Sequence, residues 1–368
     1  ANGNLIYASE IKAILAHPDV RKEVNPIALE NYLTFQYSVL EETFFKGIFK
    51  LMPAHCFTFK DGKMDIKRYW EPVFEADRSK SLEEYVDEID AAMQDSIKAH
   101  KVADVEVGSF LSSGVDSSYV AACFHGDKTF TVGFDYEKYN EIDYAKALSE
   151  KIKIDNYSKL ISKKEYWDSI PTVQYHMDEP LADASAIALY FVTKTASEQV
   201  KTCMSGEGAD ELFGGYPLYR QAVWAERWQK MPRAVRRALA ALLPGCGLLH
   251  RGALPRWQRS ARANYVFETT QERDKYLKRD YCAPTPAQRC KPYFDAVRGL
   301  DEPTAVQWVD WQTWLPRDIL RKADRMSMAH SLELRVPFLD RQVLAAAQTL
   351  PRRYRCTGRR GKIALRAA

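Results

Sequence analysis

Two short stretches of the sequence combine carboxylates with serine and glycine, the residue types that bind phosphates and metal ions. The first, SSGVDSS at 112–118, places Asp116 among small residues, and the second, SGEGADEL at 205–212, carries Glu207 and Asp210 beside glycines. Small residues allow backbone N–H groups to approach an anion, and serine hydroxyls add donors. Carboxylates hold divalent metal ions and act as general bases. The two stretches therefore predict a metal–nucleotide site.

The first stretch differs from the common phosphate-binding loops. It contains neither GxxxxGK[ST] nor GxGxxG, and it has no lysine. Asp116 would repel a bare phosphate, so the stretch fits phosphate only if a divalent cation lies between them. Taken alone, it fits an ordinary strand-to-helix turn with a capping aspartate equally well. The glycines and acids at 205–212 favour the functional interpretation, and an acidic loop with helix-capping charges is the alternative.

The surrounding elements predict how the two stretches are positioned. An apolar segment at 105–111 predicts a strand that ends at the first stretch, and a strand at 200–205 ends at the second. Further strands are expected at 129–134 and 156–162, and helices at 117–124, 140–152, 163–177 and 186–199. Strands that alternate with helices indicate an α/β fold with a doubly wound parallel sheet, in which ligands bind outside the carboxyl ends of the strands.

The segments on either side of this α/β core differ from it. Before it, we expect a strand at 4–8, a helix at 9–17, a hairpin at 55–70 that turns at Asp61-Gly62, and a polar linker at 72–80. Apolar residues at helical spacing predict a long helix from Ser81. After Gly215 the sequence is almost entirely helical in character, and the arginine-rich segment at 232–243 is interpreted as a solvated helix face.

Composition excludes several classes of protein. A chain of 368 residues exceeds one ordinary core and predicts two domains. The net charge of +4, from 53 basic and 49 acidic residues, gives no reason to expect nucleic acid as a partner. The seven cysteines form no CxxC pair, so neither a zinc site nor a disulfide framework is predicted, and reduced thiols indicate a cytoplasmic protein. The apolar segment at 238–249 is too short to span a membrane.

Motifs along nearly the whole chain resemble those of one family. SSGVDSS resembles the SGGxDSS pyrophosphate-binding loop of ATP pyrophosphatases (PP-loop proteins), with Ser113 in place of the first glycine. SGEGADELFGGY is similar to the matching loop of the glutamine-hydrolysing asparagine synthetases. The segments at 321–340 and 361–366 resemble that family's helical signature and its K-x-x-L-R segment, and those at 5–15 and 47–59 resemble the end of its glutaminase domain.

The resemblance implies how the chain is divided. It implies an adenine nucleotide α-hydrolase-like (PP-loop) synthetase domain with a helical lobe at 75–368, preceded by a small β-rich remnant of a class II glutamine amidotransferase domain at 1–74. The family's glutaminase domain begins with a cysteine nucleophile, whereas the first cysteine here is the internal Cys56. We therefore expect a fragment that lacks most of the glutaminase domain and the C-terminal tail, and that needs free ammonia or the missing part.

The resemblance also implies a reaction. In this family, the side-chain carboxylate of aspartate attacks the α-phosphorus of ATP, which gives β-aspartyl-AMP and pyrophosphate. Ammonia derived from glutamine then displaces AMP and forms asparagine. The implied substrates are aspartate, ATP and ammonia or glutamine, with Mg²⁺ as the metal. The implied protein is a cytoplasmic ligase without nucleic-acid or membrane partners, and a homodimer is compatible with it.

Motif positions assign a role to each candidate residue. The pyrophosphate is expected to be held by Ser112, Ser113, Gly114, Asp116 and Ser117, and the metal by Asp116 and Asp210. The adenosine pocket is expected to be lined by Leu111, Val132, Ser205 and Gly206, largely through backbone groups. Glu207 would promote formation of the intermediate and deprotonate the incoming ammonium, and Lys362 would neutralise charge at the α-phosphate.

Alternatives stay open at this point. Another amide-forming ligase on the same scaffold, such as a β-lactam-forming or peptide-cyclising synthetase, would share the adenylation site and differ in the acceptor pocket. A non-catalytic nucleotide-binding module would not need Glu207. Lys362 also fits a surface lysine, and His176 is interpreted as a core or surface histidine. The charges at 321–325 are interpreted as a network that packs the helical lobe on the sheet, although one of them could touch phosphate.

Overall fold

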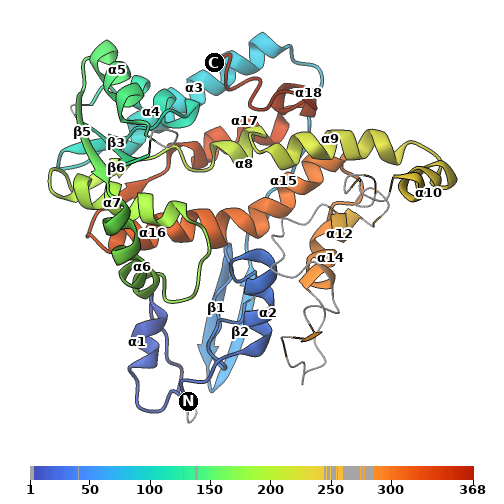
Figure 1. The fold of residues 1–368 in the computed structure, drawn as a ribbon, viewed down its shortest axis with the longest axis horizontal. Coiled ribbons are helices and arrows are strands. Elements are labelled where there is room, and N and C mark those ends of the chain that lie inside the picture. Colours follow the sequence, from blue (N-terminus) through green and yellow to red (C-terminus); the bar gives the residue numbers. More distant parts are fainter. Residues whose placement is uncertain are drawn as a thin grey trace.

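The computed structural model of the chain describes residues 4–39, 41–126, 128–136, 140–243, 246, 249, 254, 256–259, 274–275, 277 and 286–368. The α/β part lies on one side of the molecule, and long helices run from it across the middle (Figure 1). The N-terminal segment, residues 4–74, lies beneath these helices. Three parts of the chain therefore meet around the central helices.

A five-stranded sheet forms the centre of the α/β part. Its strands are β3 (Val107–Phe110), β4 (Lys128–Phe134), β5 (Asp155–Ile161), β6 (Thr202–Met204) and β7 (Glu333–Arg335), in the order β5-β4-β3-β6-β7. All four neighbouring pairs are parallel. The order runs outward from β3 on one side and from β6 on the other, so the winding reverses between these two strands. The predicted doubly wound parallel sheet is confirmed.

Strand β7 was not predicted from the sequence, which is almost entirely helical in character after Gly215. Its residues pair with β6 from Thr202↔Glu333 to Met204↔Arg335. The Ser205 N–H extends the pairing by donating to the Arg335 carbonyl at 2.9 Å. A strand of three residues is too short to leave a period-two pattern, so only its tertiary partner reveals it.

The helices around the sheet occupy the predicted places within a few residues. They are α3 (Leu82–His100), α4 (Val115–Phe124), α5 (Ile142–Ile152), α6 (Lys163–Met177) and α7 (Ser185–Ser197) (Figure 1). A capping box opens α3, in which the Ser81 side chain accepts from the Glu84 N–H and the Glu84 carboxylate accepts from the Ser81 N–H. Helix α4 begins two residues before the predicted start, which places Asp116 in its first turn.

A helical lobe follows, as expected. Its elements are α8 (Ala209–Phe213), α9 (Pro217–Gln229), α10 (Arg233–Leu242), α12 (Arg256–Arg259), α14 (Pro286–Ala296), α15 (Glu302–Gln312), the π-type turn η2 (Leu315–Ile319), α16 (Leu320–Met328), η3 (Pro337–Leu339), α17 (Arg341–Thr349) and α18 (Arg352–Arg355). Residues 302–311 of α15 are all buried, so this helix is the centre of the lobe. No helix in the described ranges is both long and apolar enough to cross a membrane.

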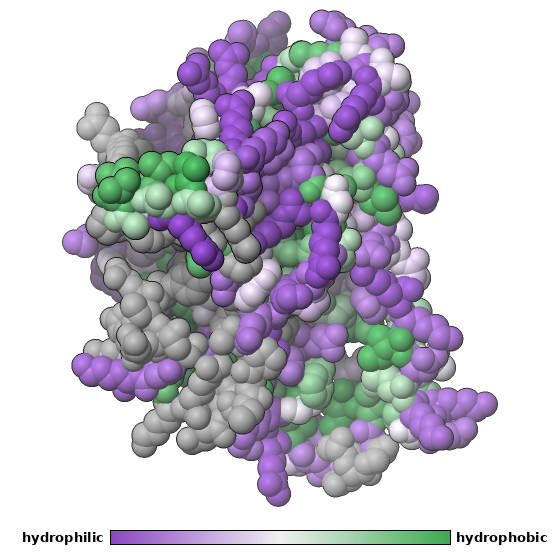
Figure 2. All heavy atoms as spheres, turned by 90° about the vertical axis from the view of Figure 1, so that its right-hand side faces the viewer, coloured by the Kyte–Doolittle hydropathy of each residue, from purple (hydrophilic) through white to green (hydrophobic). Residues whose placement is uncertain are grey.

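The arginine-rich segment forms α10 on the outside of the molecule. Figure 2 shows this side, which is largely hydrophilic, with an apolar patch at the height of α10. Arg237 is exposed, and so are Val235 and Leu242 on the same helix. The segment is therefore an exposed amphipathic helix, which agrees with its interpretation as a solvated face.

The N-terminal segment is less β-rich than expected. Strands β1 (His55–Lys60) and β2 (Lys63–Arg68) form the predicted hairpin, in which Asp61 and Gly62 both have positive φ, as a tight two-residue turn requires. Residues 4–8 form no strand, and α1 is confined to Ile11–Leu15. Helix α2 (Pro26–Phe35) was not predicted, although the Asn25 side chain caps it by accepting the Ile27 N–H at 3.1 Å.

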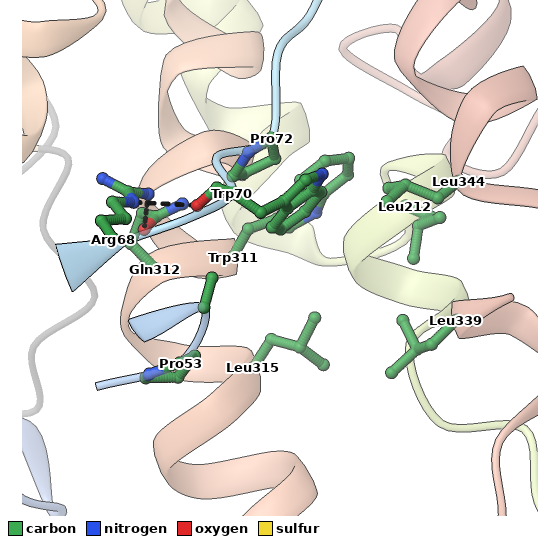
Figure 3. Close-up of a pocket in the computed structure, with 11 residues that line it drawn as sticks. Pro53, Arg68, Trp70, Pro72, Leu212, Trp311, Gln312, Leu315, Leu339 and Leu344 are labelled. Atoms are coloured by element: carbon green, nitrogen blue, oxygen red, sulfur yellow. Dashed lines mark hydrogen bonds between the residues drawn. The ribbon is translucent and has the colours of Figure 1, made fainter. Parts of the chain in front are cut away.

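An apolar cavity of about 190 Å³ marks the junction between the hairpin and the helical lobe. Figure 3 shows Trp70 and Pro72 beside Trp311 at one side, with Leu212, Leu339 and Leu344 across from them. The polar groups at its edge are paired, because Arg68 donates to the Gln312 side chain and to the Trp70 carbonyl, both at 3.0 Å. We call this space the junction cavity.

Ion pairs add a second junction, between the N-terminal segment and the end of α6. Asp178, in a left-handed conformation with φ 62°, accepts the Ile11 N–H at 2.9 Å and the Lys12 ammonium at 3.0 Å. The buried Glu179 carboxylate accepts the Phe44 N–H at 2.9 Å and pairs with Lys50, 2.5 Å away. A structural role is thus clear for both acids.

Two of the charges at 321–325 join the same junction. Arg321 donates to Glu179, and Arg325 donates to Glu10 at 3.0 Å and to the Ser9 carbonyl at 2.6 Å. The prediction that this network packs the helical lobe on the sheet is therefore wrong for these two arginines, which bind the N-terminal segment and the end of α6. Sequence spacing shows that charges share a helix but not which element they meet.

Candidate active site

A second, larger cavity of about 460 Å³ opens at the carboxyl ends of β3 and β6, where the winding of the sheet reverses. Residues of both predicted loops, of β4 and α7, and of the first turn of α16 line it. Ligands of open α/β sheets bind at this kind of position. The fold therefore brings the two chemically suggestive stretches to one place, which we call the strand-end cavity.

The loop after β3 is held by its own serines. The Ser117 hydroxyl accepts the Ser112 N–H at 3.0 Å and lies 2.8 Å from the Ser112 hydroxyl, which in turn accepts the Gly114 N–H at 3.1 Å. Gly114 is the N-cap of α4 and carries no side-chain cap, so the positive end of this ten-residue helix faces the loop. These contacts give the loop the geometry of an anion site.

Ser113 differs from its neighbours in the loop. It is exposed and does not line the cavity, and its N–H donates to the Glu141 carboxylate at 3.1 Å. The Ser113 N–H thus already donates to a carboxylate oxygen, which is anionic like the phosphate oxygen that the prediction assigns to it. The contact supports anion binding by this N–H, while a role for the Ser113 hydroxyl stays a prediction.

Close packing joins the two loops at Gly206. A Cβ atom added there would lie 2.9 Å from both the Ser117 nitrogen and the Asp116 Cβ, closer than real Cβ contacts allow. Gly206 lines the cavity next to the buried Ser205, so backbone forms this part of the wall. The glycine therefore acts here through close approach, as expected for a loop that lies against a nucleotide.

Lys362 is the cation that connects the carboxylates of the two loops. Its ammonium lies 2.5 Å from Asp116 and 2.7 Å from Asp210. The residue is 6% exposed and has φ +54°, a left-handed conformation that non-glycine residues rarely adopt. A Cβ on Gly215 would lie 2.3 Å from the Lys362 Cε, so only glycine leaves room for this side chain. The alternative of a surface lysine is wrong.

Asp116 keeps unused binding capacity in spite of this pairing. Its Oδ1 atom is buried and has no hydrogen-bond partner in the described part of the chain. Burial raises the pKa of Asp116, the Lys362 ammonium opposes that shift, and Asp210 adds to it. A buried carboxylate oxygen without a partner is costly, so the arrangement fits a ligand that supplies positive charge.

The other end of the cavity is apolar. It is lined by the predicted Leu111 and Val132 together with Phe110, Phe130, Leu189 and Val192. A flat aromatic base suits such a wall, because apolar and aromatic side chains supply most of the contact in small-molecule sites. The predicted adenosine residues therefore lie together, next to the anion-binding loop.

Glu207 lies between two groups of charges. Burial raises its pKa, the Lys322 ammonium lowers it, and the carboxylates of Asp183, Asp210 and Asp116 raise it again. An acid with a raised pKa is better matched to proton transfer near neutral pH than an ordinary glutamate. The predicted catalytic residue thus lines the cavity in a suitable environment.

Lys322 is a cavity residue that sequence reasoning did not assign. It is 4% exposed and lines the cavity, where its ammonium pairs with Asp183 and donates to the Ser185 hydroxyl at 2.7 Å. Burial alone would lower its pKa, but the carboxylates of Asp183, Asp318 and Glu207 raise it, so the lysine is charged. Lys322 lies in the family-like segment at 321–340, but the sequence did not indicate which charge of that segment reaches the site.

Glu211 and Tyr216 also line the cavity and were not predicted as site residues. The Tyr216 hydroxyl donates to the Glu211 carboxylate at 2.7 Å, and burial raises the pKa of Glu211 to about 8. The Glu211 carbonyl accepts from Trp311 and Gln307, both at 3.0 Å, which fixes α8 against α15. His176, by contrast, is not among the residues that line the cavity.

The carboxylates at the strand-end cavity supply only part of the coordination shell of a magnesium ion. No group of three or more metal-ligating side chains occurs among the described residues. Asp116 and Asp210 nevertheless present carboxylates to one place, and Asp116 has the free oxygen noted above. Magnesium commonly takes only one or two protein carboxylates and completes its shell with phosphate and water. The two aspartates fit an ion that arrives with a nucleotide.

Comparisons with known proteins show which family the chain resembles along its whole length. A model of the asparagine synthase family matches residues 88–368, and a glutamine amidotransferase domain model matches residues 1–70. Asparagine synthetase [glutamine-hydrolyzing] 1 of Bacillus subtilis is 38% identical over 382 residues, which cover 100% of this chain and 60% of that protein. A putative asparagine synthetase of Mycobacterium tuberculosis is 37% identical over 387 residues, with 100% and 59% covered.

The chain therefore spans about three fifths of the length of the curated relatives it matches. Among solved structures, an NMN synthetase from Francisella tularensis matches 68% of this chain and 94% of its own, at 13% identity and a TM-score of 0.27. A TM-score this low supports no argument about the fold, which is defined here by the strand order and the parallel pairing.

Proposed function

Because the chain belongs to the asparagine synthase family, we propose that its strand-end cavity activates the side-chain carboxylate of aspartate with ATP and converts it to the amide of asparagine. The carboxylate attacks the α-phosphorus, which gives β-aspartyl-AMP and pyrophosphate. Ammonia then attacks the acyl carbon, and AMP leaves. ATP and aspartate are the substrates of this proposal, and asparagine, AMP and pyrophosphate are its products.

The loop at 112–117 binds the β- and γ-phosphates in this proposal. Its N–H groups and the N-terminus of α4 stabilise the negative charge that grows on the departing pyrophosphate. Lys362 adds a positive charge beside them and keeps Asp116 and Asp210 from repelling the triphosphate. The apolar wall holds adenine at the other end of the cavity. Each well-placed donor of this kind contributes about 2.7–4 kcal/mol to lowering the barrier.

Asp116 and Asp210 would hold the magnesium ion, and Asp116 offers an oxygen that has no hydrogen-bond partner within the described ranges. When bound, the ion would neutralise negative charge on the phosphates. The two carboxylates orient it, and Lys362 fixes the carboxylates. Without that lysine, the two acids would repel each other and the nucleotide.

Glu207 performs the proton step of the second half-reaction. It lines the cavity with a raised pKa, so it can accept the proton that ammonium must lose before nitrogen attacks the acyl carbon. Ammonia from glutamine would come from the glutaminase part of a longer protein, of which the N-terminal segment resembles one portion. We keep the cytoplasmic location and the homodimer as expectations.

One observation carries the proposal: Lys362 bridges two loop carboxylates at the reversal point of the sheet, beside an Asp116 oxygen that no described residue binds. The test is pyrophosphate release from ATP with Mg²⁺, aspartate and ammonium chloride. We expect release that depends on aspartate, with asparagine as product, and its loss in Asp116→Asn. Release without aspartate dependence would refute the choice of acceptor. It would favour another amide-forming ligase on this scaffold.

A further inference from the structure

Lys322 is a second buried lysine near Glu207, besides Lys362, and it lines the strand-end cavity. Glu207 interacts electrostatically with Lys322 and Asp183 on one side and with Asp210 and Asp116 on the other. Lys362 is committed to the second pair. Among the described residues that line the cavity, Lys322 is the cation. The cavity therefore offers one positive group away from the phosphates.

The Lys322 ammonium has a donor left for a ligand. An ammonium carries three N–H donors. Asp183 accepts one and the Ser185 hydroxyl a second, while the Asp318 carboxylate is 3.8 Å away, too far for a hydrogen bond. No other hydrogen bond of this ammonium occurs in the described part of the chain. A buried cation with a free donor that faces a cavity is suited to bind an anionic group.

The proposed substrate carries a group of this kind. Aspartate has two carboxylates, and the one that attacks phosphorus must lie at the α-phosphate. The other, on the α-carbon, enters a cavity in which Lys322 is the one cation among the described lining residues. A charged carboxylate moved out of water without a partner loses several kcal/mol, so it needs a cation inside. Lys322 is placed to provide it.

We propose that Lys322 is the residue that recognises the α-carboxylate of the acceptor amino acid. This inference rests on the proposed function and deepens it, because it names the group that selects aspartate. Asp183 and Ser185 hold the ammonium in place before substrate arrives, so little side-chain entropy is lost on binding.

The test compares aspartate with β-alanine, which is aspartate without its α-carboxylate. In Lys322→Met we expect the KM for aspartate to rise about 10- to 100-fold, as for loss of a charged hydrogen bond, and the KM for ATP to change by less than about threefold. β-Alanine, measured as a competitor of aspartate in pyrophosphate release, should keep its inhibition constant within about threefold. Lys164→Met, which removes an exposed lysine paired with Asp168, is the matched control.

Two results would overturn the inference. One is an unchanged KM for aspartate, and the other is an equal loss of affinity for aspartate and β-alanine, which would indicate a structural role. Removing one partner of a buried ion pair can also prevent folding. In that case, the double variant Lys322→Met with Asp183→Asn removes both charges. The KM for aspartate and the inhibition constant of β-alanine are then compared in this double variant. If the unaltered protein shows no aspartate-dependent release at all, the proposed function fails, which is a separate outcome.

Discussion

The two cavities of this molecule lie on either side of helix α8 and differ in how they treat polar groups. Asp210 and Glu211 line the strand-end cavity, whereas Leu212 lines the junction cavity. In the strand-end cavity, a buried oxygen of Asp116 has no partner among the residues that the structure describes, and two lysines are surrounded by acids. At the junction cavity, Arg68 is paired, and the indole of Trp311 donates to a backbone carbonyl.

This difference separates a binding site from a packing defect. Unpaired buried polar groups lower stability, so a fold retains them where a ligand or a reaction requires them. An apolar gap costs only lost contacts and shows no chemical preference. Cavity size alone would not have distinguished the two spaces, but the unsatisfied carboxylate does. Changes in the two cavities should therefore affect different properties.

The largest effect is expected when the bridging lysine is removed. Lys362→Met leaves Asp116 and Asp210 without their shared cation, and we expect kcat for aspartate-dependent pyrophosphate release to fall by about 10²–10³-fold. Steady-state kinetics at saturating ATP measure it. Lys164→Met should retain full activity, since its side chain is exposed. A Lys362→Met protein with normal kcat would contradict the assignment.

A smaller loss is expected at the contact between the loops. Gly206→Ala places a methyl 2.9 Å from the Ser117 nitrogen, so the loops must separate. Overpacking of this kind typically costs about 1–3 kcal/mol, and we expect kcat/KM for ATP to fall about 10- to 100-fold. Gly299→Ala is the control, because an added methyl there meets nothing within 4 Å. Equal behaviour of the two variants would show that close approach at Gly206 is unimportant.

A third prediction concerns pH. Burial raises the pKa of Glu211 from 4.5 to about 8, so the folded protein keeps a proton that the unfolded chain loses. Its contribution to stability is complete below pH 4.5 and is lost as pH rises to about 8, with a slope of at most about 1.4 kcal/mol per pH unit. Glu211→Gln cannot ionise. Denaturant titrations between pH 5 and 8 should therefore give a flatter profile, and an unaltered slope would disprove this.

The smallest effect is expected in the junction cavity. Leu344→Phe adds apolar volume to a space of about 190 Å³, and filling such a cavity typically adds about 0.5–2 kcal/mol to the free energy of unfolding. The KM values for ATP and aspartate should not change. Leu51→Phe, at an exposed leucine, is the control and should leave the melting temperature nearly constant. A change in KM for Leu344→Phe would mean that the junction cavity is coupled to the site.

Local patterns predicted most of the α/β core because each element carries its own signal. The capping box of α3, the Asp61-Gly62 turn and the two glycine-bearing loops are all contained in short stretches of sequence. The two loops also contained the polar residues at the centre of the prediction that line the strand-end cavity, among them Asp116 and Glu207. The order of the strands then explains why the loops meet.

What sequence did not reveal depends on tertiary contacts. β7 is a strand only because β6 lies beside it, and Lys322 is a cavity residue only because α16 begins at a π-type turn against α7. Arg321 and Arg325 look equivalent to Lys322 in the sequence but turn to the N-terminal segment and the end of α6. Which of several charges on one helix enters a site is decided by its neighbours in space.

The bridge made by Lys362 also has a consequence for the order in which the protein is made. It joins residues 246 positions apart, and a ribosome adds about 5–20 residues per second, starting from the N-terminal end. The loops that carry Asp116 and Asp210 thus emerge well before their common counter-ion. During that interval, the two carboxylates lack their common cation. A nascent chain would therefore complete this bridge only when the segment around Gly361 docks beside Gly215.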